Sequence, residues 1–298
     1  MNNITLRQLR YFNALAEHQH FGRAALACSI SQPALSMQIK ELEETLGQIL
    51  FERHAKQLQL TEFGKSLLGR TQEIARSIDE ISDMARAAKN SITGKLRIGI
   101  IPTIAPYMLP SIIETLTNAY SGIDIHVRET LTPNLIQELN DGKLDTAILA
   151  LPISETWATE VTLFKEDFVL IRHANDKEKP IPDGEKLQKM RLLLLEEGHC
   201  FRDQALSFCN MRPGVPRDGL DGSSLSTLVQ MVGAGIGVTL IPQMAVDVET
   251  RAANVSIGHF PNPKPSRTIG MVWRKSSPLA TQLIEISQVI RQAVSDQV

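Results

Sequence analysis

Residues 21–47 read FGRAALACSISQPALSMQIKELEETLG and contain two helical patterns separated by a short polar turn. The first pattern runs from about Phe21 to Cys28 and is rich in alanine, whose small side chain allows another helix to approach closely. Ser31 is the expected N-cap of the second helix, and Pro33 fits its first turn because a missing N–H costs nothing there. Apolar residues then recur at helical spacing until Gly47 ends the pattern. The stretch therefore predicts a helix, a turn and a second helix.

The flanking sequence extends this unit on both sides. A preceding helical pattern places Leu6, Leu9, Phe12 and Ala16 on one apolar face, and three helices in this order are typical of a helix-turn-helix. Two short strand patterns, Leu50–His54 and Gln57–Leu60, lie on either side of Ala55-Lys56 and predict a wing.

A long helix is expected after Thr61. Its apolar positions step alternately by four and three residues, as in a heptad repeat: Leu67, Thr71, Ile74, Ile78, Ile81, Ala85 and Ala88. Such a helix either packs on its own domain or dimerises. We favour dimerisation, because a helix-turn-helix that binds DNA needs a partner.

The texture changes after Thr93-Gly94 to short apolar strands that alternate with helices, which predicts an α/β domain with a mostly parallel sheet. The expected strands are Leu96–Ile101, Thr146–Leu151, Phe168–Arg172, Leu192–Leu195, Val238–Ile241 and Thr268–Trp273. The expected helices are Leu109–Tyr120, Leu135–Asn140 and Leu225–Ala234. Met211–Gly222 is rich in proline and glycine and predicts a long loop. The glycines at 233, 235 and 237 precede a strand, so they indicate a tight helix-to-strand turn and no dinucleotide site.

Composition limits the classes of protein that remain. The chain has 298 residues, which predicts about two domains, and 43% hydrophobic with 21% charged residues is ordinary for a globular protein. There is no apolar run of about 18 residues and no secretory signal pattern, so we expect a cytoplasmic protein with no membrane partner. Residues 1–70 carry eight Lys/Arg against six Asp/Glu, so charge alone does not indicate nucleic acid.

The helix-turn-helix predicts binding to double-stranded DNA, because the second helix of such a unit enters the major groove and presents polar side chains to base edges. The alternative is an ordinary three-helix bundle. The candidate DNA contacts on that helix are Ser31, Gln32, Pro33, Ser36, Gln38 and Lys40, with Arg53 and Lys56 contributed by the wing.

These residues also carry a family resemblance. Ala24-Ala25-x-x-Cys28-x-x-Ser31-Gln32-Pro33-Ala34-Leu35-Ser36-x-Gln38-Ile39, continued by Leu42-Glu43, Leu46-Gly47, Leu50-Phe51-x-Arg53 and Thr61-x-x-Gly64, resembles the winged helix-turn-helix of LysR-type transcriptional regulators. The match is ungapped over about 60 residues. It implies a dimerising linker helix, an effector domain that resembles periplasmic solute-binding proteins, and homodimers or homotetramers.

The resulting expectation has three domains. Residues 1–60 form the all-α winged helix-turn-helix, and residues 61–92 form the linker helix. Residues 93–298 form a two-lobed α/β effector domain, with lobe I at about 93–164 and 267–298 and lobe II at about 165–266.

Two of the three cysteines lie nine positions apart, at Cys200 and Cys209. Three interpretations are open for them. His199, Cys200 and Cys209 could ligate a metal, although no Cys-x-x-Cys spacing supports this and we expect no metal. Both cysteines could be small buried hydrophobic residues, the interpretation that suits Cys28 among its alanines. The third interpretation is a redox switch.

Geometry shows what that switch requires. If residues 201–209 are helical, nine steps of about 1.5 Å separate the two Cα atoms by roughly 13 Å. A disulfide needs Cα atoms about 4.4–6.8 Å apart. Oxidation would therefore have to unwind the helix, which converts a redox event into a conformational one.

Gly198-His199-Cys200-x-Arg202-Asp203-Gln204-x-x-x-x-Cys209 resembles the signature of the peroxide-sensing members of the LysR family, and the agreement includes Ile101-Pro102-Thr103. The resemblance implies that Cys200 is the peroxidatic cysteine and Cys209 the resolving one. It also implies that Thr103, Thr132 and His199 position peroxide and that Arg267 is a basic group beside the reactive sulfur. The sequence departs from the family at Ser223 and Ser226, where threonine and glutamate are usual.

The sequence therefore predicts a transcriptional activator and no enzyme or cofactor. Its implied partners are promoter DNA, hydrogen peroxide, cellular thiol reductants and RNA polymerase. Two alternatives stay open: a LysR-type regulator that binds a small metabolite between the lobes, and a thiol peroxidase, against which the DNA-binding segment argues. A stand-alone solute-binding protein is not expected because an export signal is missing.

Overall fold

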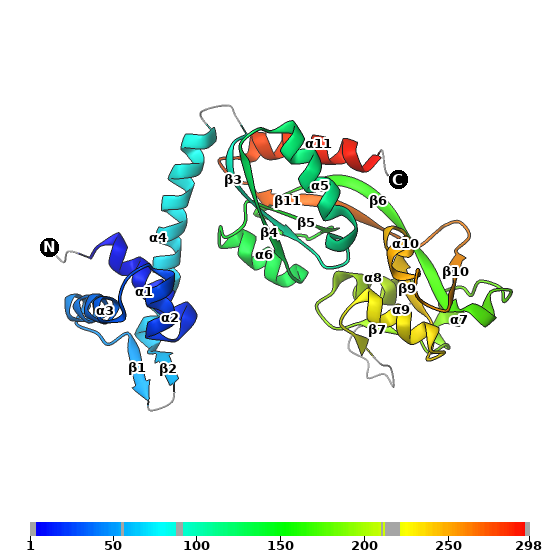
Figure 1. The fold of residues 1–298 in the computed structure, drawn as a ribbon, viewed down its shortest axis with the longest axis horizontal. Helices are drawn as coiled ribbons and strands as arrows, with labels where there is room; N and C mark the ends of the chain where they lie inside the picture. The colour runs from blue at the N-terminus through cyan, green and yellow to red at the C-terminus, as the bar shows by residue number, and fades with distance from the viewer. Residues whose placement is uncertain (1–3, 55–56, 88–91, 210, 212–220, 296–298) are drawn as a thin grey trace. The chain divides into compact units, whose positions relative to one another are not determined.

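The computed structural model describes residues 4–54, 57–87, 92–209, 211 and 221–295 (Figure 1). The chain divides into two units, Met1–Ser82 and Asp83–Val298. No helix within the described ranges combines the length and the apolar character that crossing a bilayer requires.

The N-terminal unit is built from helices whose ends are set by local capping residues. Its elements are α1 (Leu6–His18), α2 (Phe21–Ala27), α3 (Gln32–Leu46), β1 (Phe51–His54), β2 (Gln57–Leu60) and α4 (Glu62–Ala87). Thr5 caps α1 in a capping box with Gln8. The Ser31 hydroxyl accepts from the Ala34 N–H at 3.3 Å, and Gly47 ends α3 in the left-handed region at φ +65°. The predicted helix-turn-helix is confirmed.

A small aromatic and aliphatic core holds α1, α2, α3 and the wing together. Phe12 and Leu15 on α1 and Leu35 on α3 are fully buried, and the Phe12 and Phe51 rings lie 5.5 Å apart between centroids. The two wing strands pair antiparallel, with Phe51 opposite Leu60, as predicted. Ala55 and Lys56 at the tip lie outside the described residues.

The start of α4 is locked against the end of α3 and the wing. The Thr61 hydroxyl donates to the Ile49 carbonyl at 2.8 Å and accepts from the Gly64 N–H at 2.9 Å. A Cβ at Gly64 would lie only 2.4 Å from the Leu50 carbonyl oxygen, so the close approach requires glycine. Every position of the predicted heptad repeat except Ala88, which lies outside the described residues, falls on α4.

The second unit has the expected alternation of strands and helices. Its elements are β3 (Gly94–Ile100), α5 (Ala105–Ala119), β4 (Ile123–Glu129), α6 (Thr132–Asn140), β5 (Thr146–Leu151), β6 (Ala158–His173), η1 (Ala174–Asp176), α7 (Gly184–Gln188), β7 (Leu194–Leu195), α8 (Cys200–Phe208), β8 (Asp221–Gly222), α9 (Leu225–Gly233), β9 (Thr239–Pro242), η2 (Gln243–Ala245), α10 (Val246–Glu249), β10 (Val255–His259), β11 (Ser266–Arg274) and α11 (Ala280–Ser295).

The main sheet is mixed, so the prediction of a mostly parallel sheet is wrong. The strand order is β10-β6-β11-β5-β3-β4, with β9 also paired to β6. Only the β3–β4 and β3–β5 pairs of this described sheet are parallel, and β11 runs antiparallel to both β5 and β6. The reason is the chain path: after β5 and after the second lobe, the chain returns through long strands in place of helical crossovers.

Two hydrophobic cores divide this unit. Core I is drawn from residues 96–163 and 269–294, and core II from residues 168–260. Strand β6 belongs to both, since Ala158–Asp167 pairs with β11 and Phe168–His173 pairs with β9 and β10 (Figure 1). We call the parts around the two cores lobe I and lobe II.

Sequence analysis missed β4, β10 and the first half of β6, because their patterns are not continuously apolar. The first half of β6 alternates between buried and exposed residues, β4 is a largely exposed edge strand, and β10 is partly exposed. The last two residues of the predicted loop Met211–Gly222 form β8. Residues 212–220 of that loop lie outside the described residues. The glycine turn after α9 is confirmed, because a Cβ at Gly237 would lie 2.2 Å from the Arg191 carbonyl.

Two glycines of α4 provide a matched test of this packing. Gly64→Ala is expected to destabilise the N-terminal unit by about 1–3 kcal/mol, because the added methyl group meets the Leu50 carbonyl. Gly69→Ala meets nothing within 4 Å and is expected to stabilise the helix by up to about 1 kcal/mol. Hydrogen exchange of α1 and α3 peptides in the full chain measures both. Equal effects of the two substitutions would contradict the packing described.

Candidate functional site

The first turn of α8 brings Cys200 to the boundary between the two lobes. Cys200 is the first residue of the helix and follows His199, its N-cap. Gly198 has φ +93°, the left-handed conformation that lets the chain turn sharply into the helix. The Cys200 side chain is partly buried and packs against core I, whereas Phe201 and the rest of the helix pack in core II.

Cys209 lies at the opposite end of the same helix. It is the C-cap of α8 and is fully buried in core II. Because the segment is helical, about 1.5 Å of rise per residue separates the two Cα atoms by roughly 13 Å. Cys200 and Cys209 are not joined in a disulfide, and they cannot join while α8 is intact.

The same separation argues against a shared metal ion. Cys200 and Cys209 cannot ligate one ion from the two ends of a helix, because zinc–sulfur bonds are about 2.3 Å long. Within the described ranges no group of three His, Cys, Asp or Glu side chains converges on a point.

A pocket of about 320 Å³ lies beside the N-terminus of α8, between the two lobes. Residues of both lobes line it, among them Thr103, Glu129 and Leu131 of lobe I and His199, Ser226 and Glu249 of lobe II. Thr103 and His199, two of the residues expected to position peroxide, are therefore brought together. Thr132, Cys200 and Arg267 are not part of the lining.

Thr132 is nevertheless adjacent to this pocket. It is the first residue of α6 and follows Leu131, whose side chain would lie 3.0 Å from a Cβ at Gly198. The Thr132 hydroxyl is buried and has no hydrogen-bond partner among the residues that the structure describes. A buried hydroxyl without a partner is costly unless a ligand or water satisfies it.

Arg267 is held rigidly behind the pocket. It is 3% exposed, and its Nε donates to Glu166 Oε2 at 2.8 Å. Nη1 donates to the Thr103 hydroxyl at 2.8 Å and Nη2 to the Thr103 carbonyl at 3.0 Å. Its guanidinium carbon lies 5.4 Å from the centroid of the Phe201 ring, the residue directly after Cys200. Arg267 is thus linked both to a pocket residue and to α8.

Burial lowers the pKa of His199, and the nearby Glu196 carboxylate opposes this shift only in part. The imidazole is therefore neutral at neutral pH and carries one N–H and one acceptor nitrogen. Arg202, by contrast, is used structurally: Nη1 donates to the Leu195 carbonyl at 2.6 Å and pairs with Asp221 at 3.0 Å, which ties α8 to the β7–β8 pair.

Three polar residues of the site were not found from the sequence: Glu166, Tyr107 and Glu249. Tyr107 of lobe I donates to Glu249 of lobe II at 2.6 Å, and Ser226 donates to the other oxygen of the same carboxylate. Burial, followed by the hydrogen bond to Glu249, raises the pKa of Tyr107, so the phenol stays protonated. The family usually has glutamate at the position of Ser226. Here Ser226 donates a hydrogen bond to a carboxylate on another element, Glu249 of α10.

The candidate DNA-binding face is the N-terminal half of α3. Gln32, Pro33 and Lys40 are exposed, and Ser36 and Gln38 are partly exposed. Ser31 is occupied as the N-cap, and Gln38 donates to Glu41 at 2.6 Å. Arg53 lies on β1, but its side chain is not among the parts of the chain that the structure describes. Lys56 lies outside the described residues altogether.

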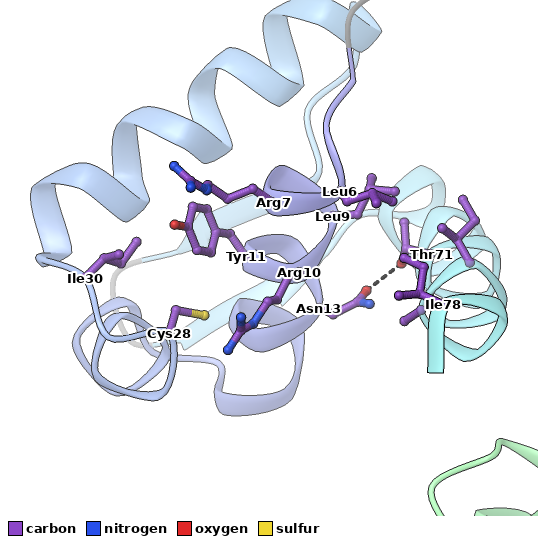
Figure 2. A pocket seen from close by; sticks show the side chains of 12 residues that line it. Leu6, Arg7, Leu9, Arg10, Tyr11, Asn13, Cys28, Ile30, Thr71 and Ile78 are labelled. Atoms are coloured by element: carbon purple, nitrogen blue, oxygen red, sulfur yellow. Dashed lines mark hydrogen bonds between the residues drawn. The ribbon is translucent and has the colours of Figure 1, made fainter. Parts of the chain in front are cut away.

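A groove of about 780 Å³ lies in the N-terminal unit between α1 and α4 (Figure 2). Leu6 and Leu9 of α1 and Ile78 of α4 line it, and Thr71 donates a hydrogen bond to Asn13 across it. The α4 wall of the groove exposes apolar side chains, since Ile74 is 41% and Ile78 is 39% exposed. A lone soluble helix does not normally present such a stripe.

Two protein-family models match the chain. One, described as a bacterial regulatory helix-turn-helix protein of the lysR family, covers residues 6–65. The other, described as the LysR substrate binding domain, covers residues 89–295. The chain belongs to the LysR family of transcriptional regulators.

This LysR-family regulator is similar over nearly its whole length to proteins named for hydrogen peroxide. It is 40% identical to a probable hydrogen peroxide-inducible genes activator of Streptomyces viridosporus, over 98% of this chain and 95% of the relative. It is also 40% identical to the DNA-binding transcriptional dual regulator OxyR of Escherichia coli K12, over 97% of this chain and 95% of that protein.

Solved structures agree. A full-length cysteine-to-aspartate variant of OxyR from Pseudomonas aeruginosa matches with a TM-score of 0.74 and 36% identity, over 97% of this chain and 95% of that one. A cysteine-to-serine variant of Corynebacterium glutamicum OxyR with bound H2O2 matches with a TM-score of 0.67 and 34% identity, over 98% and 93% of the two chains. The predicted fold class is confirmed, and this LysR-family member is a DNA-binding regulator and not an enzyme.

Proposed function

We propose that this LysR-family regulator senses hydrogen peroxide through a reversible disulfide between Cys200 and Cys209, and acts on promoter DNA in the cytoplasm. The observation that carries the proposal is the placement of the two thiols at opposite ends of α8, each packed in a different core. Bond formation cannot occur without breaking that arrangement. The similarity to OxyR proteins over the whole chain supports the same conclusion.

The chemistry has two steps. Peroxide occupies the pocket between the lobes, where Thr103 and His199 offer polar groups and the unpartnered Thr132 hydroxyl lies next to the lining residue Leu131. The Cys200 thiolate attacks one oxygen, so that an S–O bond forms and the O–O bond breaks. The other oxygen leaves as hydroxide and takes up a proton to become water, and Cys200 becomes a sulfenic acid.

Resolution follows when the Cys209 sulfur attacks the sulfenic sulfur and expels water. Cys209 has to leave core II, or Cys200 has to leave core I, so α8 unwinds and the contact between the lobes changes. Cellular thiols reset the switch by supplying two electrons through thiol–disulfide exchange.

The remaining parts of the chain transmit this change to DNA. We assign residues 1–60 to DNA binding, 61–92 to the linker helix and 93–298 to the effector domain, with α3 and the wing as the DNA contacts. The open apolar stripe of α4 suits a second copy of the chain, which supports a homodimer or a homotetramer. Activation would act through RNA polymerase at the promoter.

A metabolite sensor is the second candidate. The pocket volume of about 320 Å³ exceeds what peroxide fills and reaches the lower range of small-molecule sites. Calorimetry against a panel of metabolites, together with thiol counting after a stoichiometric peroxide pulse, separates the two. Peroxide sensing requires loss of two thiols per chain, whereas metabolite sensing requires heat of binding with all thiols retained.

Three serine variants test the peroxide proposal. Cys200→Ser should lose all peroxide-dependent change in the DNA footprint while still binding DNA. Cys209→Ser should form a sulfenic acid that dimedone traps, but no disulfide. Cys28→Ser is the matched control and should respond like the wild type, because Cys28 is buried in the N-terminal unit and burial raises the pKa of its thiol.

Mass spectrometry reads the linkage directly. Trypsin cleaves after Arg202, between the two cysteines, so the disulfide joins peptides 192–202 and 203–217. Linked peptides are expected in oxidised wild type and Cys28→Ser only. A peroxide response that survives in Cys200→Ser, or wild type that stays unlinked, would show the proposal to be wrong.

A second test concerns DNA recognition. Gln32→Ala should weaken binding to DNA selected in vitro by the wild type by about 1–3 kcal/mol and leave non-specific binding nearly unchanged, because Gln32 is placed to read a base edge. Lys40→Ala should weaken both kinds of binding alike and lower the salt dependence, as expected for a phosphate contact. Equal losses on both DNAs for Gln32→Ala would contradict its assignment.

A further inference from the structure

We infer that Glu166 is a positioning residue for the reaction of Cys200 with peroxide: through Arg267, it fixes the Thr103 hydroxyl as a hydrogen-bond donor to the leaving oxygen. The inference rests on the proposed peroxide chemistry and extends it to a residue outside the pocket. It is carried by an unbroken chain of hydrogen bonds from Glu166 to Thr103.

The first link of this chain is set by strand register. Glu166 on β6 pairs directly with Arg267 on β11, so the two side chains share one face of the sheet. Glu166 is 6% and Arg267 is 3% exposed. A guanidinium buried to this degree requires an opposite charge, and the Glu166 carboxylate supplies it at 2.8 Å.

Glu166 is itself held in place from lobe II. Its second oxygen, Oε1, accepts from the Met244 N–H at 3.0 Å, at the start of the η2 turn that follows β9. Each carboxylate oxygen therefore has one defined donor. The carboxylate cannot rotate without losing one of these hydrogen bonds, and so Arg267 is fixed in direction as well as neutralised.

The second link determines what Thr103 can do. The Thr103 hydroxyl accepts from Arg267 Nη1 at 2.8 Å, and a guanidinium has no acceptor to offer in return. The hydroxyl hydrogen is thus free to be donated elsewhere, and no acceptor among the described residues takes it. Because Thr103 lines the pocket, that hydrogen is available to a molecule bound there.

A fixed donor is what the leaving oxygen needs. Negative charge develops on that oxygen as the S–O bond forms and the O–O bond breaks, and a preoriented donor stabilises it most in the transition state. The hydroxide then becomes water by taking up a proton equivalent to the one the Cys200 thiol released. If Arg267 were free to turn, Thr103 could accept from peroxide as readily as donate to it, and this preference would be lost.

Glu166→Gln tests the inference. The amide keeps the size of the side chain but has a single acceptor oxygen, so it cannot serve both Arg267 and Met244. We expect the second-order rate constant for loss of the Cys200 thiol with hydrogen peroxide to fall about tenfold to a hundredfold, a part of what removal of an oxyanion donor costs. Quenched-flow alkylation and mass spectrometry measure it.

A second electrophile separates positioning from general damage. Iodoacetamide alkylates Cys200 and releases iodide, a leaving group that gains little from a hydrogen bond. The alkylation rate is measured against pH up to its plateau, where the thiol is fully ionised. This plateau rate should change less than about threefold in Glu166→Gln. Asp167→Asn is the matched control, because the neighbouring Asp167 is partly exposed and pairs with the surface residue Lys264. It should leave both rates unchanged.

A second variant, Thr103→Val, tests whether Glu166 acts through Thr103. Thr103→Val should show the same selective loss of the peroxide reaction, and adding Glu166→Gln to it should cause no further loss. If Glu166→Gln proves unstable, Glu166→Asp is the alternative because it retains the negative charge. It should slow the reaction of Cys200 with peroxide a fewfold and leave the reaction with iodoacetamide unchanged. In a Thr103→Val background it should cause no further loss.

The outcomes are distinct from those of the proposed function. If peroxide links Cys200 to Cys209 in the wild type but the Glu166 variants react at the wild-type rate, the positioning role is wrong and the peroxide sensor stands. Equal losses with peroxide and iodoacetamide, or additive losses with Thr103→Val, also overturn it. If the wild type forms no link, the peroxide sensor itself is wrong.

Discussion

The rise of an α-helix is the constraint on which the account of this protein depends. Nine residues of helix hold Cys200 and Cys209 about 13 Å apart, far beyond disulfide distance. An isolated helix as short as α8 is not stable, and α8 persists because Phe201, Ala205 and Leu206 are buried in core II. The stability of α8 therefore comes from the packing of a few side chains. A single covalent bond can outweigh that packing, as is expected of a segment that unfolds locally.

The position of α8 explains how a local change in this helix can reach both lobes. Cys200 packs against core I while the rest of the helix packs against core II, so the Cys200 side chain is also a contact between lobes. Near it, Glu166 bonds to Arg267 on β11 and to Met244 in lobe II, and Tyr107 of lobe I bonds to Glu249 of lobe II. The site and the junction of the lobes are therefore built from the same residues.

Sequence analysis predicted the features that neighbouring residues determine, such as helix ends. It missed the features that depend on residues far apart in the sequence, such as strand direction. The ends of α3 followed from Ser31 and Gly47, because caps act within one turn. Strand direction did not follow, since β11 meets β5 and β6 only after the chain has passed through lobe II. For the same reason the role of Glu166, which lies 101 residues from Arg267, is visible only in the fold. The family resemblance assigned roles to the cysteines, Thr103 and His199, and these roles stay predictions. It assigned none to Tyr107 and Glu249, whose hydrogen bond joins the two lobes.

Hydrogen exchange over α8 in the full chain tests the central claim most directly. In the reduced protein the amides in the later turns of α8 should be protected by their helical hydrogen bonds. After a stoichiometric peroxide pulse that links Cys200 to Cys209, this protection should be lost across residues 200–209 and kept in α11, which is remote from the cysteines in sequence. Full retention of protection across α8 with the disulfide in place would contradict the account.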